Sequence, residues 1–187
     1  MSQITKHALE NSLKALLLKK PFNKITIRDL TNDCGINRMT FYYHFEDIYD
    51  LVEWSCREET FKALEDYKTA SSWQTGFTNL LLTIKENKDC ITNLVHYIDQ
   101  EEIEKHLGTL IQFLLLNVIE QEAGERLISD EDKNFIAKFY SYCFIGLLLD
   151  WIKEGMTEDP DILALKMSEV MDGSIKRALN KFEIHQN

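Results

Sequence analysis

The sequence predicts an all-α protein, and three features support that prediction. Only seven Gly and two Pro occur among 187 residues, too few for the many tight turns of an all-β chain. Apolar residues recur at three- and four-residue intervals, the spacing of a core-facing helix. Residues that favour helix starts, such as Thr26 and Asn37, precede two of these stretches. We therefore expect a three-helix head followed by an α-helical body.

The first two expected helices lie close together. The first spans residues 5–19, and its core-facing stripe is Ala8, Leu9, Ser12, Leu13, Leu16 and Leu17. The second opens at Thr26, whose hydroxyl can cap free N–H groups while Asp29 sits in the favourable first turn. It should end near Cys34, where Gly35 turns the chain.

The third helix is expected to begin after Asn37 and to end around Phe45. Phe41 and Phe45 mark its core face at 100° per residue. The opposite side and its flanks then hold Met39, Tyr43, Thr40 and Tyr42. Two short helices joined by a Gly-containing turn are typical of a helix-turn-helix, in which the second helix enters the major groove. Tri-helical heads also serve as protein-binding modules, so periodicity alone leaves both uses open.

The remaining elements form a connector and a helical body. The connector is expected from residue 47 to about 67, with residues 69–73 breaking it. Further helices are expected at 73–87, 89–97, 100–123, 130–154 and 160–182. We predict two domains, a helix-turn-helix head of residues 1–47 and an all-helical body of residues 48–187. The stretches 113–118 and 135–151 suit a ligand pocket, although ordinary core is the commoner role of such stripes.

Charge is divided unevenly along the chain. The formal net charge is −10, yet residues 1–45 carry seven Lys or Arg against three acidic residues. Their net charge is therefore about +4, and the remainder of the chain carries −14. Because phosphates attract Lys and Arg, the head rather than the body is the part suited to nucleic acid.

Composition also excludes several classes of protein. The four cysteines, Cys34, Cys56, Cys90 and Cys143, form no C-x-x-C pair, so we expect reduced thiols rather than disulfides or a zinc site. No apolar run reaches the roughly 18 to 20 residues of a membrane span, and the first ten residues lack the order of a signal peptide. We expect a cytoplasmic protein with no membrane partner and no cofactor.

Catalytic and metal sites find little support in the sequence. His96 and His106 lie near three glutamates, Glu101, Glu102 and Glu104, but the Glu-x-x-His spacing of helical di-iron sites is absent. No paired nucleophile and base and no phosphate loop can be placed. We therefore expect neither a bound metal nor an enzyme.

The head resembles a known family. The run T-I-R-D-L-x-x-x-C-G-I-N-R-M-T-F-Y-Y-H-F, residues 26–45, is similar to the N-terminal signature of TetR-type (TetR/AcrR) transcriptional regulators, with T-F-Y-Y-H-F as its core. Residues 37–54 resemble the subgroup of dihydroxyacetone kinase regulators. A looser similarity covers F-Y-S-Y-C-F-I-G-L-L-L-D-W-I-K-E-G-M, residues 139–156. The resemblance implies a regulator that binds double-stranded DNA and is not an enzyme.

The resemblance also implies roles for individual residues. Those at or near bases are Arg28, Asn37, Arg38 and Thr40, and those at phosphates or the groove wall are Tyr42, Tyr43 and His44. Arginine can pair with guanine, and asparagine with adenine, through two hydrogen bonds, and Arg38 is the first candidate for base readout. Backbone N–H groups at Thr26 can receive a phosphate, and the outward Met39 completes the predicted DNA-binding set. For His44 a half-buried place in the core is an equal alternative.

One departure from the family pattern motivates a second hypothesis. Many relatives place a Lys near the start of the fourth helix, where this chain has Glu46, Asp47 and Ile48. Lys6, His7, Lys20 or Lys24 are candidates to compensate for it. The alternative is a helical adaptor that binds a protein partner and no longer binds DNA specifically.

The resemblance implies DNA binding by residues 1–47, and effector binding and dimerisation by residues 48–187. Segments 130–154 and 160–182 of two subunits would pack as a four-helix interface, with Gly146 and Gly173 permitting close approach. The homodimer would place two reading helices in successive major grooves, so the operator should be near-palindromic. A small-molecule or protein effector bound to the body would tilt the fourth helix. The operator, the effector and the direction of regulation stay open.

Overall fold

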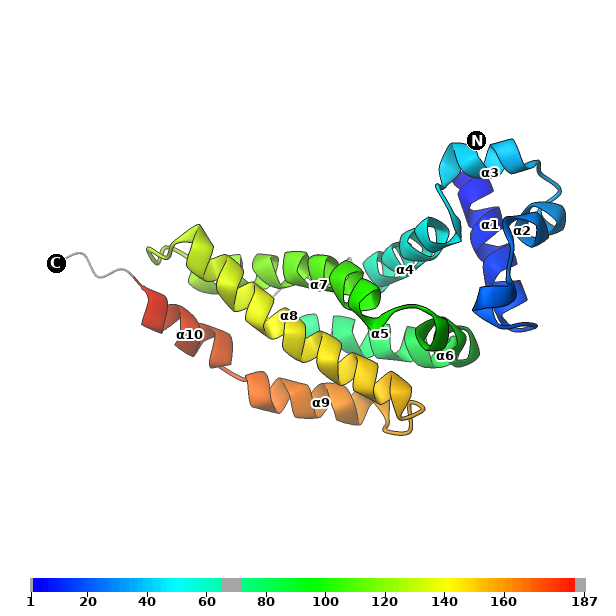
Figure 1. Cartoon of the computed structure of the whole chain (residues 1–187). Coiled ribbons are helices and arrows are strands. Elements are labelled where there is room, and N and C mark those ends of the chain that lie inside the picture. Colours follow the sequence, from blue (N-terminus) through cyan, green and yellow to red (C-terminus); the bar gives the residue numbers. More distant parts are fainter. Residues whose placement is uncertain (1, 65–71, 184–187) are drawn as a thin grey trace.

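The computed structural model describes the backbone of residues 2–64 and 72–183, and their side chains except at positions 2, 106 and 110. The described residues contain helices and no strand, which confirms the predicted all-α class. Figure 1 shows the head at one end of an elongated helical body. The elements are α1 (Ser2–Leu17), η1 (Phe22–Lys24), α2 (Ile27–Asp33), α3 (Arg38–His44), α4 (Ile48–Leu64), α5 (Trp73–Glu86), α6 (Lys88–Tyr97), α7 (Gln100–Ala123), α8 (Asp130–Lys153), α9 (Pro160–Met171) and α10 (Ser174–Phe182).

Helix α1 forms the back of the head, and its limits differ slightly from the prediction. It begins at Ser2 and ends at Leu17, followed by a short 3-10 turn. The predicted stripe is correct for Leu9, Leu13 and Leu17, which are buried, whereas Ala8 is exposed. A small side chain at the margin of a helix stripe adds little to burial, so the spacing alone overstated the width of the buried face.

Two cores divide the molecule. The head core contains the buried side chains of α1 to α3, and it continues into the first turns of α4 through Leu51, Val52 and Trp54. From α6 it also takes Cys90 and Leu94. The larger body core is built on α5 and α7 to α10. The domain limits at residues 47 and 48 stay a prediction, but α4 and α6 clearly belong to both parts.

The body confirms four of the five predicted helices and corrects the fifth. Helices α5 to α8 match their expected spans within one residue. The helix expected over 160–182 is instead divided into α9 and α10 at Asp172 and Gly173. Gly173 has φ +61°, a left-handed conformation that ends a helix and favours glycine. Within one chain its role is therefore to turn the backbone, and close approach of a second subunit at Gly173 stays a prediction. The breaker expected at 69–73 falls largely outside the described residues.

Helix α8 runs along the whole body (Figure 1). Among the described helices it is long and apolar enough to cross a membrane by length and composition, with a mean hydropathy of 1.4 over its most apolar window. Half of that window is buried inside the molecule, against α7 in particular. A core helix of a soluble protein has the same properties.

Candidate functional site

Helix α2 is held at its start by a capping box. The Thr26 hydroxyl oxygen accepts a hydrogen bond from the Asp29 N–H (3.2 Å), and the Asp29 carboxylate accepts one from the Thr26 N–H (2.8 Å). At the other end Gly35 adopts φ +65° and turns the chain toward α3. The cap and the turn predicted from the sequence are both confirmed, and together they set where α3 begins.

Helix α3 is anchored by a cap and by two buried rings. The Asn37 side-chain oxygen accepts hydrogen bonds from the Thr40 N–H (2.8 Å) and the Thr40 hydroxyl (3.1 Å). Phe41 and Phe45 are 0% and 2% exposed, with ring centroids 5.9 Å apart. This packing fixes the rotation of α3 about its axis, as the 100° spacing predicted.

The outer face of α3 is a row of large exposed side chains. Met39 is 77% exposed, Tyr43 81% and Tyr42 54%. Arg38 is also exposed, as is Arg28 on α2. His44 is half-buried, with its ring centroid 5.0 Å from that of Tyr43, which is compatible with either of its two predicted roles. The nine predicted residues therefore lie on α2, α3 and the residues that cap them, with the largest exposed side chains gathered on one short helix.

Most of the cations expected to compensate for the missing Lys have intramolecular partners. Lys20 forms an ion pair with Asp29 at 2.7 Å, and this contact is the first cause that lowers the pKa of Asp29 to about 2. The Lys6 ammonium lies 5.2 Å from the centroid of the Phe45 ring, and His7 contacts Glu10 at 3.1 Å. Lys24 is exposed. Side chains already held inside the head are less free to grip a phosphate.

Two acidic side chains near the start of α4, Asp47 and Asp50, accept hydrogen bonds from nearby backbone N–H groups. The Asp50 N–H donates to the Asp47 carboxylate at 2.9 Å, and the Glu46 N–H donates to the Asp50 carboxylate at 2.9 Å. These bonds satisfy backbone groups before and within the first turn of α4, where acidic side chains also suit the helix dipole. In the sequence, Asp47 stands out only as part of the stretch that lacks the family's Lys.

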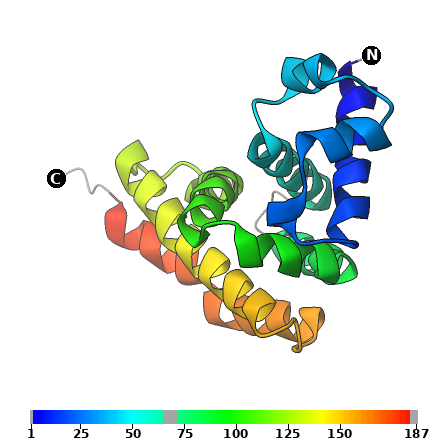
Figure 2. The same ribbon diagram turned by 45° about the vertical axis from the view of Figure 1, so that its right-hand side comes forward.

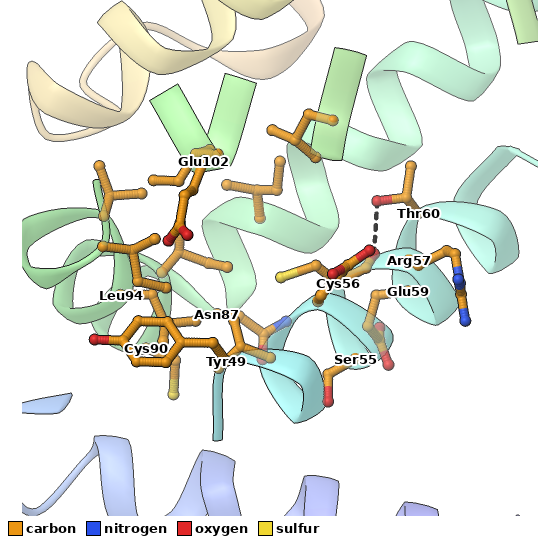
Figure 3. A pocket seen from close by; sticks show the side chains of 18 of the residues that line it. Tyr49, Ser55, Cys56, Arg57, Glu59, Thr60, Asn87, Cys90, Leu94 and Glu102 are labelled. Atoms are coloured by element: carbon orange, nitrogen blue, oxygen red, sulfur yellow. Dashed lines mark hydrogen bonds between the residues drawn. The ribbon is translucent and has the colours of Figure 1, made fainter. Parts of the chain in front are cut away.

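A cavity of about 900 Å³ lies between the head and the body. Its lining comes from α1 and from α4 to α8. Its apolar side chains include Leu80, Ile84, Ile91, Leu94, Val95, Ile98, Ile103, Leu107, Ile111, Leu148, Leu149 and Ile152. Figure 3 shows the Glu102 carboxylate pointing toward the interior, whereas the Arg57 guanidinium points away from it. Charged side chains also line it, among them Lys14, Glu53, Glu59, Glu102 and Lys105. A mainly apolar cavity that also presents polar groups is the usual form of a small-molecule site.

A charged network lies on the α1 side of this cavity, with Lys14 and Glu59 in its lining. The Lys14 ammonium contacts the Glu10 carboxylate at 2.9 Å and the Glu59 carboxylate at 3.1 Å. Burial lowers the pKa of Lys14, but the hydrogen bonds to both carboxylates outweigh this effect and raise it. Nearby, burial raises the pKa of the Cys56 thiol to about 11. Lys14 is therefore a fixed link between α1 and α4.

Exposed apolar residues gather on α8 and α9, within the segment predicted to dimerise. Phe135, Phe139 and Tyr142 are all more than half exposed and follow one another at helical spacing on α8. The next position in this row is Gly146, where a Cβ would meet no atom within 4 Å other than its chain neighbours and the backbone of its own helix. Exposed large residues on α9 are Ile162, Leu165 and Val170. Such apolar surface is characteristic of an interface.

The metal hypothesis gains nothing from the structure. Among the described residues no group of three His, Cys, Asp or Glu side chains is arranged to hold an ion. The side chain of His106 lies outside the described part of the chain.

Comparison with known proteins identifies the family to which this geometry belongs. A TetR-type family model, the transcriptional regulator C-terminal region, matches residues 71–173, more than half of the chain. The chain is 26% identical over 182 residues to the uncharacterized HTH-type transcriptional regulator YxbF of Bacillus subtilis (strain 168), covering 90% of this chain but only 44% of that protein.

Two further likenesses involve DhaS. The chain is 22% identical over 156 residues to the HTH-type dhaKLM operon transcriptional activator DhaS of Lactococcus lactis subsp. lactis (strain IL1403), with 82% of each protein covered. The solved structure of the dihydroxyacetone kinase operon activator DhaS superposes with a TM-score of 0.71 at 21% identity, over 97% of this chain and 99% of that one. The chain thus belongs to the TetR family of transcriptional regulators, whose helix-turn-helix accounts for the head.

Proposed function

We propose that this regulator binds a near-palindromic operator as a homodimer and responds to an effector bound in its body. The observation that carries the proposal is the exposed row of α3. Met39 and Tyr43 are more than three-quarters exposed on a helix whose other face is buried. Large side chains presented in this way on a short second helix suit a helix that enters the major groove.

The proposed contacts divide into two kinds. Arg38 reads a base edge, with Arg28 and Thr40 beside it, because guanidinium groups and hydroxyls can bond base edges. The phosphate or groove-wall contacts come from Met39, Tyr42, Tyr43 and His44 and from the first turn of α2 after Thr26. The capping box engages the N–H groups of Thr26 and Asp29, so a phosphate there would meet the N–H groups between them. Asn37 contributes mainly by capping α3, since its oxygen is engaged by Thr40 and only its amino group is available for a base.

We propose that dimerisation uses residues 130–182. The exposed aromatic row of α8 and the apolar residues of α9 supply a surface that pairing of two copies would bury. The two reading helices would then lie about 34 Å apart, one turn of DNA. The cavity next to α4 and α6 is the proposed effector site, and its apolar walls with charged side chains among them favour an organic molecule that carries both apolar and polar groups. These activities place the protein in the cytoplasm.

The test is a titration of DNA flanking the protein's own gene, followed by fluorescence anisotropy at two salt concentrations with scrambled DNA as competitor. Arg38→Ala should weaken binding by roughly 5- to 150-fold, the range for loss of one good base contact. Arg57→Ala removes the same charge from an exposed side chain on α4 and is the matched control. It should leave specific affinity unchanged.

Equal binding of scrambled DNA, unaffected by Arg38→Ala, would reject the proposal and favour the adaptor hypothesis. Dimerisation is tested separately by sedimentation velocity. Phe139→Glu should give a monomer, because a charge would be buried in the interface. Leu127→Glu places the same charge at an exposed apolar residue outside the proposed interface and should leave the dimer intact.

A further inference from the structure

We propose that Asn93 on α6 couples the cavity to the DNA-binding head, a regulatory role that rests on the proposed effector response. The family resemblance implies transmission through the fourth helix. Asn93 provides a second connection, at the C-terminal end of α1. It joins the head to α6, a helix that also lines the cavity.

The carboxamide of Asn93 makes three hydrogen bonds to the backbone of the head. Its nitrogen donates to the carbonyl oxygens of Leu17 (2.8 Å) and Lys20 (3.0 Å), and its oxygen accepts from the Phe22 N–H (2.9 Å). The last carbonyl groups of a helix have no partners within that helix. One side chain from the body therefore satisfies the turn that ends α1 and begins η1.

Helix α6 presents its two sides to different parts of the protein. Cys90 and Leu94 pack in the head core, and the Cys90 thiol also donates to the Lys14 carbonyl oxygen (3.6 Å). Ile91 and Val95 pack against the body core and line the cavity. Figures 1 and 2 both show α6 lying between the head and the body. A ligand in the cavity would touch the same helix that holds the end of α1.

The connection consists of three short hydrogen bonds, whose strength depends on their direction. Hydrogen bonds lose most of their strength when the donor and acceptor separate or tilt beyond their narrow range. A displacement of α6 must therefore carry Leu17 to Phe22 with it or break three bonds at once. The packing of α1 against α2, and of α2 against α3, would transfer that movement to the reading helix.

The experiment measures the position of the head directly. Spin labels are attached at Asn32→Cys, exposed on α2, and Glu125→Cys, exposed in the body, in a Cys143→Ser background. Burial raises the pKa of the Cys34, Cys56 and Cys90 thiols, which slows their reaction with the label. Labelled protein is diluted with unlabelled protein so that double electron–electron resonance reports distances within one chain.

Ile91→Phe enlarges the cavity face of α6 and serves as a built-in substitute for a ligand. It should shift the mean head–body distance when Asn93 is present. In the Asn93→Ala background the distribution should broaden and the shift should disappear. Val95→Phe, one turn along α6, repeats the test if Ile91→Phe does not fold, as judged by circular dichroism.

Two controls separate coupling from general loosening. Thr92→Ala alters an exposed neighbour on the same helix and should retain both the narrow distribution and the shift. Asn93→Asp keeps the acceptor for the Phe22 N–H but loses both donors. Hydrogen exchange at Phe22 should therefore accelerate about fivefold, the worth of one hydrogen bond, in Asn93→Ala and not in Asn93→Asp.

An equal shift with and without Asn93, or no shift in either background, would overturn the proposal. So would an unchanged distribution in Asn93→Ala. None of these measurements uses DNA, an effector or the dimer, so a failure of the proposed function would leave them interpretable.

Discussion

Replacing Asn37 separates its structural role from any role in reading DNA. Its oxygen accepts two hydrogen bonds from Thr40 at the start of α3. Asn37→Ala removes this cap and should lower the free energy of unfolding by about 1 kcal/mol. For a chain of 187 residues that corresponds to a decrease in Tm of about 2–4 °C. Asn37→Ser supplies another good capping oxygen, so stability should change by only a few tenths of a kcal/mol.

The two variants should therefore behave differently in two assays. Urea unfolding followed by circular dichroism should show a lower free energy of unfolding for Asn37→Ala than for the wild type. Asn37→Ser should be indistinguishable from the wild type in this assay. Because the oxygen needed for a bidentate adenine contact is engaged by Thr40, we expect Asn37→Ser to keep operator affinity within about fivefold. A larger loss of affinity at unchanged stability would refute this reasoning and assign Asn37 to base readout.

Three further predictions concern the core, the α2 cap and the thiols. Phe41→Ala should cost about 3–5 kcal/mol in urea unfolding, because this ring is fully buried; a cost below 1 kcal/mol would contradict the packing. The pKa of Asp29 is lowered from 3.8 to about 2, first by its contact with Lys20. The stabilising effect of the Asp29 carboxylate is therefore present above about pH 4 and lost as the pH falls through 2. NMR titration of this carboxylate measures it, and Asp29→Asn should abolish that pH dependence. Exposed Cys143 should react with a disulfide reagent long before Cys56, whose pKa is about 11. Peptide mass spectrometry measures the order of modification, and faster modification of Cys56 would contradict the prediction.

Local signals in the sequence were sufficient to predict most of the helices and the helices that carry the candidate interface. Caps at Thr26 and Asn37 act within three residues, so their effects can be inferred without a tertiary structure. The spacing of Phe41 and Phe45 likewise predicted the buried side of α3. The division of the last helix was missed because an apolar pattern continued across Gly173, whose positive φ depends on how the chain turns.

The partner of a charged side chain could not be predicted from its position in the sequence. Lys20 was considered as a phosphate contact, but folding places its ammonium against Asp29, nine residues away. The Lys6 side chain lies over the Phe45 and Trp54 rings. A long flexible side chain takes whichever partner the fold brings near, so its role is set by tertiary structure.

By itself, the sequence determined the helical class, the helix-turn-helix and the side of α3 that faces outward. Each depends on interactions between residues a few positions apart, which helix geometry makes periodic. Only the tertiary structure revealed the cavity, the dual membership of α6 and the contacts of Asn93 with the end of α1. The contacts of Asn93 join residues more than 70 positions apart, and no local pattern encodes a hydrogen bond that forms only after separate helices have packed.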